Sequence, residues 1–166
     1  MKKFFKIIFA GVMLFTLVAC GVPESQKVLD SYLGSIKSGK IMENETDQQT
    51  KVLGKIFQKM EYKIIKTTET GDTAKIEVQI KAVNLAAYMA DYMGKMMPLA
   101  FSGMSDKAIE ATSIKYFDDL AKSKDLSYIE ETVTACLSKK NGKWQIDNTE
   151  EIGNVISGNV ATMFEE

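Results

Sequence analysis

Carboxylates, tyrosines, methionines and two cysteines are the side chains through which this chain could do chemistry. Its sequence contains no His, and its 21 basic residues are all Lys. The lack of His excludes a Ser-His-Asp or Cys-His arrangement, a His-ligated metal and an imidazole base. The lack of Arg removes the guanidinium fork that binds phosphate and carboxylate groups through two hydrogen bonds. Composition alone therefore excludes many common classes of enzyme.

Tyrosines and methionines gather in a segment that predicts a helix over residues 84–98. Tyr88, Met89, Tyr92 and Met93 recur there at helical spacing on one face. Soft thioethers bind Cu(I), so Met89, Met93 and Met96 form a candidate copper site. The same methionines also suit an adaptable core or the wall of an apolar groove. The three interpretations stay open. We expect no cofactor, because no calcium loop, P-loop or GxGxxG motif occurs in the sequence.

Five residues are the predicted contacts for a small apolar ligand or a protein partner. Four of them come from the helix over residues 84–98, and the fifth comes from a strand near the C-terminus. Aromatic rings and thioethers suit such contacts because they offer large apolar surfaces. The predicted contact residues are Tyr88, Met89, Tyr92, Met93 and Trp144. No residue is assigned a catalytic or metal-binding role.

The N-terminus carries the pattern of an export signal. Lys2, Lys3 and Lys6 precede an almost wholly apolar run over residues 7–18. This run suits a signal peptide and is too short to span a bilayer, which takes about 20 residues. Leu17-Val18-Ala19-Cys20 follows at once and resembles the lipobox of bacterial lipoproteins.

The lipobox resemblance implies that the Cys20 thiol receives a diacylglyceryl group, that the chain is cleaved before Cys20, and that the new N-terminus is acylated, with palmitate among the acyl chains. Residues 1–19 would be the lipoprotein signal peptide, residues 20–23 a lipidated tether, and residues 24–166 a single α+β domain. Two or three acyl chains hold a protein stably on a bilayer. We therefore expect a protein anchored to the cell membrane by its N-terminal acyl chains, with the domain facing outside the cytoplasm.

Cleavage would also change the charge and the cysteine content of the chain. Loss of three lysines takes the net charge from −1 to about −4. A mildly acidic domain lacks the basic stripe that nucleic acids require, so we expect no nucleic-acid partner. Cys136 would be the one cysteine left unacylated, which excludes an internal disulfide.

Hydrophobic periodicity predicts helices and antiparallel hairpins. Pro98 is expected to end its helix, and Asn141-Gly142 predicts a type I′ turn. The last helix carries an apolar stripe as far as Met163. The predicted helices cover 24–39, 46 onward, 84–98, 105 or 106 onward and 148 onward, and the strands cover 61–70, 73–82, 127–140 and 143–147. This order predicts an α+β fold, in which a curved antiparallel sheet of about four strands is packed by N-terminal, inserted and C-terminal helices.

A family resemblance follows from these elements. Two leading helices, a curved sheet and the late strand Asn141-Gly142-Lys143-Trp144-Gln145-Ile146-Asp147 resemble the nuclear transport factor 2-like (cystatin-like) roll. The chain is most similar to small lipoproteins of low-GC Gram-positive bacteria that carry domains of unknown function on that roll. The resemblance covers roughly residues 24–147. The C-terminal helix and the helical insert depart from the minimal roll.

Three functions stay open, because proteins of this superfold range from isomerases to binding modules. One is a purely structural or assembly role, in which Met163 and Phe164 near the C-terminus would dock a partner. The favoured one is a non-enzymatic module that binds an apolar ligand or a partner through the concave sheet face and the helix over 84–98. The alternative is an isomerase- or hydrolase-type enzyme with a carboxylate base in the cone of the roll. Resemblance to the isomerases would make Asp91 the base and Tyr88 or Tyr92 the oxyanion donor. That alternative requires a buried carboxylate with a raised pKa facing a cavity.

Overall fold

The computed structural model describes residues 21–164, so the predicted signal peptide and Cys20 lie outside the described residues. The described chain contains five α-helices, two short 3-10 helices and four strands. In chain order they are α2 (Glu24–Lys37), η1 (Lys40–Met42), α3 (Gln48–Phe57), β1 (Glu61–Thr70), β2 (Thr73–Val83), α4 (Leu85–Phe101), α5 (Asp106–Lys122), β3 (Tyr128–Lys140), β4 (Lys143–Ile146), α6 (Thr149–Ile156) and η2 (Ala161–Phe164).

The four strands form one antiparallel sheet in the order β1-β2-β3-β4, which confirms the predicted α+β class. The turn between β3 and β4 is also as predicted. Asn141 and Gly142 have φ angles of 53° and 76°, and a type I′ turn requires positive φ at both positions. A bulge after Ile64 shifts the register of β1 and turns Ile65 outward, where it is 49% exposed.

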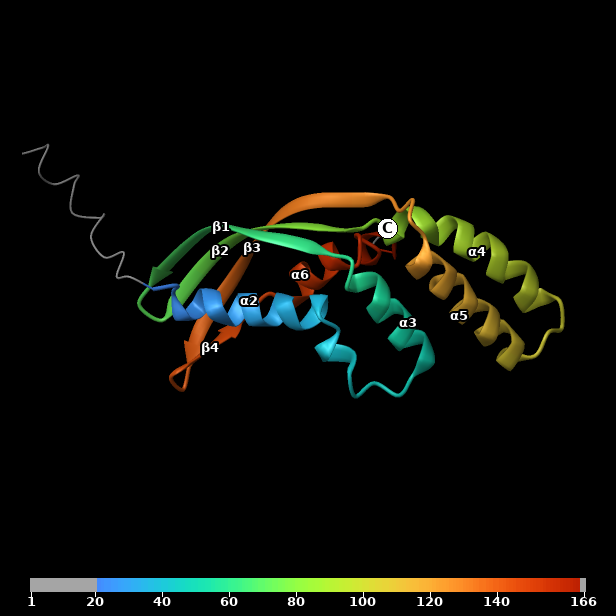
Figure 1. Ribbon diagram of the computed structural model, residues 1–166, viewed down its shortest axis with the longest axis horizontal. Coiled ribbons are helices and arrows are strands. Elements are labelled where there is room, and N and C mark those ends of the chain that lie inside the picture. The colour runs from blue at the N-terminus through green and yellow to red at the C-terminus, as the bar shows by residue number, and fades with distance from the viewer. Residues whose placement is uncertain (1–20, 165–166) are drawn as a thin grey trace, which may run out of the picture.

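Helices α2 and α6 cover the concave face of the sheet and form the main core with it (Figure 1). Alternate residues of β2 point into this core, and Ile76, Val78 and Ile80 are fully buried. Leu33 of α2 and Ile152 of α6 are fully buried against them. The concave face, where the sequence suggested a ligand, is therefore filled by side chains of α2 and of the C-terminal helix.

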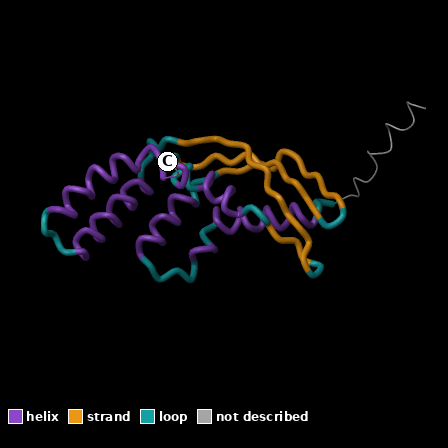
Figure 2. Tube along the Cα trace, turned by 180° about the vertical axis from the view of Figure 1, so that it is seen from behind, coloured by secondary structure: helices purple, strands orange, loops and turns teal. Residues whose placement is uncertain are grey.

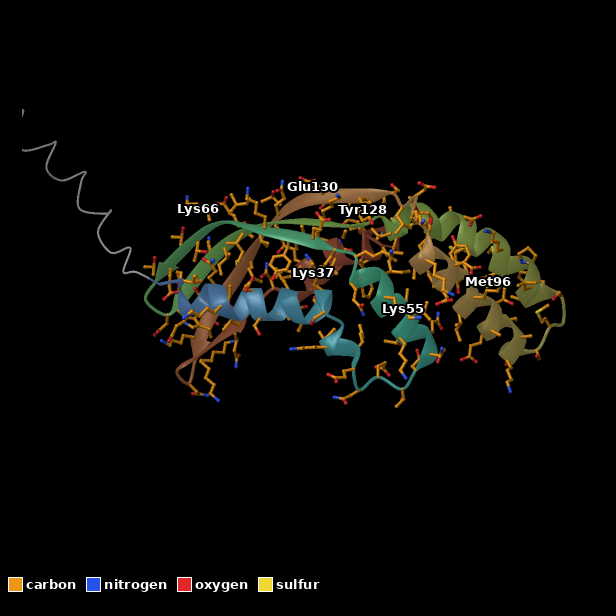
Figure 3. The ribbon with its side chains drawn as sticks, in the orientation of Figure 1. Lys37, Lys55, Lys66, Met96, Tyr128 and Glu130 are labelled. Atoms are coloured by element: carbon orange, nitrogen blue, oxygen red, sulfur yellow. The ribbon has the colours of Figure 1, made fainter. Side chains whose placement is uncertain are left out.

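The opposite face of the sheet is polar. Figure 3 shows Lys66 and Glu130 pointing away from the helices that cover the concave face. Such a sheet is buried on one face and solvated on the other, as the alternation along β2 predicts. Between residues 21 and 164, no helix is both long and apolar enough to cross a bilayer.

Helices α4 and α5 form a hairpin that projects beyond the end of the sheet and makes the molecule elongated (Figures 1 and 2). The inserted helices thus pack at the end of the sheet, beside α3, rather than over its concave face. A second buried cluster joins the hairpin to α3 and to the end of β2. Its members are Val52, Ile56, Val83, Leu85, Phe117 and Ala121.

The prediction that Pro98 ends its helix is wrong, because α4 continues through Pro98 to Phe101. A proline inside a helix removes the hydrogen bond to the carbonyl four residues earlier. That residue is Gly94, and both Gly94 and Pro98 lie at exposed positions of α4. Water can therefore serve as the donor to the Gly94 carbonyl, and the helix tolerates the proline within one turn of its end.

The last helix is shorter than predicted. It ends at Ile156, and the chain then turns before Met163. Gly158 and Asn159 have φ angles of 67° and 61°, in a left-handed conformation that ends a helix. A Cβ on Gly158 would collide with the carbonyl oxygen of Val83, so the close approach of this turn to the end of β2 also requires glycine.

Candidate functional site: an apolar cleft beside α4

Helix α4 borders an apolar cleft with a volume of about 280 Å³. The cleft lies where α3, α4 and α5 meet the segment that follows α6. Two polar residues, Gln49 and Ser157, belong to its otherwise apolar or aromatic lining. The remaining lining residues are Leu53, Phe57, Leu85, Met89, Tyr92, Phe117 and Val160.

The other hollows of the described chain suit an apolar ligand less well. One of them, of about 370 Å³, lies over the ends of the β-hairpins, and Thr68, Lys75 and Asp147 are among its lining residues. A smaller apolar hollow of about 180 Å³ lies between α2, η1 and α6, with Met42 in its wall. The cleft beside α4 combines an apolar lining with the larger volume of the two apolar hollows.

Tyr92 forms part of the cleft wall and is held there by its ring and its hydroxyl. Its ring centroid lies 4.9 Å from that of Phe117 and 5.3 Å from that of Tyr116. Its hydroxyl shares a hydrogen bond of 2.9 Å with Oγ of Ser113, to which Nε2 of Gln49 donates at 3.4 Å. Ser113 is 4% exposed. These three side chains form hydrogen bonds with one another at the edge of the cleft, so the wall of the cleft remains apolar.

Helix α4 places only two of its four predicted contact residues in the cleft. Met89 and Tyr92 line it. Tyr88 instead ties the hairpin together, because its hydroxyl accepts a 2.7 Å hydrogen bond from the backbone N–H of Ser127. Its carbonyl oxygen accepts a hydrogen bond from the hydroxyl of Tyr116 at 3.0 Å. Met93 is 40% exposed and lies outside the lining.

Trp144 is not brought together with the residues of α4. It lies on β4 in the main core, where it is 8% exposed. The Lys139 ammonium sits over its ring, 5.6 Å from the centroid. Its indole Nε1 is buried and finds no hydrogen-bond acceptor within the described residues. Trp144 therefore contributes to the sheet core rather than to the cleft.

The candidate copper ligands on α4 occupy different environments. Met89 lines the cleft, Met93 is exposed, and Met96, labelled in Figure 3, is half-buried. Residues 21–164 contain no group of three or more Cys, Asp or Glu side chains placed to hold a metal ion.

Asp91 lacks the environment of a catalytic base. Its carboxylate pairs with the Lys95 ammonium at 2.7 Å and accepts a 3.0 Å hydrogen bond from the Tyr116 hydroxyl. These two hydrogen bonds, that of Lys95 first, lower the pKa of Asp91, whereas a buried base needs a raised pKa. Desolvation, followed by the hydrogen bond to Asp91, raises the pKa of Tyr116 to about 12. Among the described residues that line the cleft, none carries a carboxyl group.

Several lining residues were not recognised as site residues from the sequence. On α3, Val52 and Ile56 are buried in the second cluster, while Leu53 and Phe57 face the cleft. Four apolar residues in one short helix make an apolar face wider than packing on one side requires. The width of this face is the sequence signal that could have identified Leu53 and Phe57. Ser113 gives no such signal, because a serine in a helix is ordinarily exposed.

Comparison with known proteins gives one similar fold. A crystal structure of a candidate lipoprotein from Bacillus subtilis, YcdA, superposes with a TM-score of 0.49 and 16% sequence identity. The match covers 80% of this chain and 46% of that protein, so this chain spans less than half of its length. The sequence matches no protein-family model. No curated protein matches it either.

Proposed function

We propose that this chain is a lipid-anchored, non-enzymatic module whose cleft beside α4 binds the aliphatic chain of a small molecule. The observation that carries the proposal is the cleft itself, with its apolar lining and a volume of about 280 Å³. Ligand pockets usually measure about 300–1,000 Å³. A volume near the lower limit suits a short chain rather than a large ring system.

The chemistry of the lining restricts the class of ligand further. No charged side chain lines the cleft in the described structure, so a charged group inside it would be desolvated without a partner. The amide of Gln49 at the edge offers a hydrogen bond to a neutral head group. A neutral molecule with a short aliphatic chain and one hydroxyl or carbonyl group meets both conditions.

The anchored location rests on the N-terminal motif. The lipobox resemblance makes Cys20 the lipidated residue, and α2 begins at Glu24, directly after the tether over residues 20–23. The helices that form the cleft lie in the half of the elongated molecule away from the start of α2 (Figure 1). The tether would therefore hold the domain near the bilayer surface while its cleft lies far from the attachment point.

Displacement of a fluorescent apolar probe tests the binding proposal. We would use the chain from Gly21 to Glu166, because among the described residues the members of both buried clusters lie from Leu29 onward. We would use a neutral probe, N-hexyl dansylamide, whose alkyl chain is expected to enter the cleft, and displace it with linear alcohols of increasing length. Each methylene buried is worth about 0.8 kcal/mol, so affinity should rise about fourfold per methylene until the cleft is full.

Two methionine variants locate the binding. Met89→Gln places a polar amide in the cleft and should weaken probe binding about tenfold. Met93→Gln makes the same exchange one helical turn away, outside the lining, and should leave binding unchanged. Equal effects of the two variants would place the probe elsewhere, and an absence of saturable binding would refute the proposal.

A further inference from the structure

The side of α4 that faces away from α5 is apolar and exposed. Its residues follow one another at spacings of three and four, which places them on one stripe. They are Ala87, Ala90, Gly94, Met97 and Phe101, all exposed. Phe101 is 87% exposed and Met97 is 56% exposed, an unusual degree for large apolar side chains on a helix.

The charged residues of α4 do not lie on this stripe. Asp91 and Lys95 pair with each other at 2.7 Å. Both turn toward α5, because the Tyr116 hydroxyl binds Asp91 and the Lys95 ammonium lies 5.0 Å from the centre of the Tyr116 ring. A helix that is apolar on both sides is normally covered on both. The stripe thus has the character of a contact surface.

The order of residue sizes along the stripe fits a second copy of the same helix. Small residues lie toward the base of the hairpin, and Met97 and Phe101 lie toward its tip. If a second α4 runs antiparallel, Phe101 falls opposite Ala90 and Met97 falls opposite Gly94. A two-fold axis repeats each of these pairs. Large side chains opposite small ones allow two helices to interdigitate closely.

We propose that the stripe is a dimerisation surface covered by the antiparallel α4 of a second copy. The stripe carries no charge, so two acidic domains can meet there without like charges in contact. The hairpin projects from the rest of the molecule, which leaves its outward side accessible (Figures 1 and 2). A helix of 17 residues is about 26 Å long. So short a contact gives a reversible dimer rather than a permanent one.

Disulfide crosslinking between two tagged full-length chains, produced together and kept in the bacterial membrane, tests this register. One chain carries Ala90→Cys and the other carries Phe101→Cys. We expect a disulfide-linked heterodimer, because the two positions are opposite each other. Each variant alone should give little crosslink, since its two copies would lie about 16 Å apart and a disulfide requires Cα atoms within about 7 Å. The unsubstituted chain controls for Cys20 and Cys136.

A charge placed in the stripe gives a second readout. A Cβ added to Gly94 meets no atom within 4 Å, so Gly94→Lys in both tagged chains should preserve the fold. It should lower the crosslink yield at least tenfold. Ala111→Lys, at an exposed position of α5, should leave the yield unchanged. The proposal fails if the heterodimer is no more than about twice as abundant as either homodimer, because random pairing gives that ratio and would be expected if α4 rests on lipid or another protein. An undiminished yield with Gly94→Lys overturns it as well.

Discussion

Tyr92 illustrates how a single residue of this protein obtains its role from neighbours distant in the sequence. Helical spacing identifies it as part of an apolar face, but its ring partners and its hydroxyl partner Ser113 come from α5. Gln49, the third polar group, comes from α3. Helix α4 therefore combines polar groups that hydrogen-bond to their neighbours at the cleft edge with an apolar wall inside the cleft. This combination suits an apolar ligand, and it does not supply a general base.

Removal of the Ser113 hydroxyl should destabilise the domain. Ser113→Ala leaves the Tyr92 hydroxyl and the Gln49 amide without their shared partner in a partly buried place. We expect a loss of about 1–2 kcal/mol in the free energy of unfolding, measured by urea denaturation. Ser102→Ala, which removes only an exposed local hydrogen bond, should change it by less than about 0.5 kcal/mol. Similar values for the two variants would contradict the role given to Ser113.

Two tyrosines should make the stability depend on alkaline pH. Desolvation first, and then hydrogen bonds to Asp30 and Asp91 respectively, raises the pKa of Tyr62 and of Tyr116 to about 12. An unfolded tyrosine has a pKa of about 10. The stability held by the neutral phenols is thus fully present below pH 10 and is lost as the pH rises toward 12.

Unfolding measured at intervals between pH 9 and 12 checks this expectation. The free energy of unfolding should fall across the window in the wild type, and it should fall less in Tyr62→Phe and in Tyr116→Phe. A titration of absorbance near 295 nm should show the late ionisation of these phenols directly. Parallel pH profiles for the wild type and both variants would rule out the assigned cause.

At the scale of elements, periodicity predicts most of the helices and strands, and local chemistry decides where they end. The alternation along β2 and the Asn141-Gly142 turn are sufficient to predict the sheet. The end of α6 is missed because its apolar stripe continues in sequence beyond Ile156. Gly158 and Asn159 end the helix in a left-handed conformation, even though the apolar stripe continues in the sequence.

Asn148 shows a second limit of local signals. It precedes α6, and its three-residue spacing to Glu151 is that of a capping box. Its amide nitrogen donates to the Glu151 carboxylate at 2.7 Å, but its side-chain oxygen accepts a 2.8 Å hydrogen bond from the backbone N–H of Cys136 instead of capping the helix. Its amide nitrogen also donates to the Thr134 carbonyl oxygen at 2.8 Å. The asparagine thus continues the hydrogen bonding of β3 beyond the end of β4. Such a role depends on tertiary structure, and helix spacing alone does not indicate it.

Two glycines of the C-terminal region should respond in opposite ways to alanine. Gly158→Ala adds a Cβ against the Val83 carbonyl oxygen at positive φ, so it should cost at least about 2 kcal/mol of stability. Gly153→Ala lies inside α6, where an added Cβ meets nothing within 4 Å, and it should gain up to about 1 kcal/mol. Thermal unfolding of both variants distinguishes them. A mild effect at Gly158 would mean that the turn does not fix the end of α6.

At the scale of the whole molecule, the sequence predicts the fold class but not which helices cover the concave face of the sheet. The amphipathic stripes and the alternation give a sheet packed by helices, as observed. They do not show that α6 fills the concave face, because that depends on how the last helix folds back. The cleft likewise depends on tertiary packing, because α3, α4 and α5 are brought together there only by the fold. Two of the predicted contact residues, Met89 and Tyr92, line this cleft, because their helical spacing places them on one face of α4.

The proposed lipid anchor would determine where the whole molecule lies. Cys20→Ala should abolish incorporation of labelled palmitate and release the protein from the membrane fraction. Cys136→Ala, at a half-buried position of β3, should leave both unchanged. Labelling that persists in Cys20→Ala would refute the assignment of the lipobox.

The most direct test of the cleft is an NMR titration of methionine methyl groups with 1-octanol, using the chain from Gly21 to Glu166. Met89 reports on the cleft, Met42 on the smaller apolar hollow, and the fully buried Met60 on the main core. Our account predicts a saturable shift of the Met89 methyl signal, with Met42 and Met60 unmoved. A saturable shift of Met42 without Met89, or no saturable shift at Met89, would contradict it.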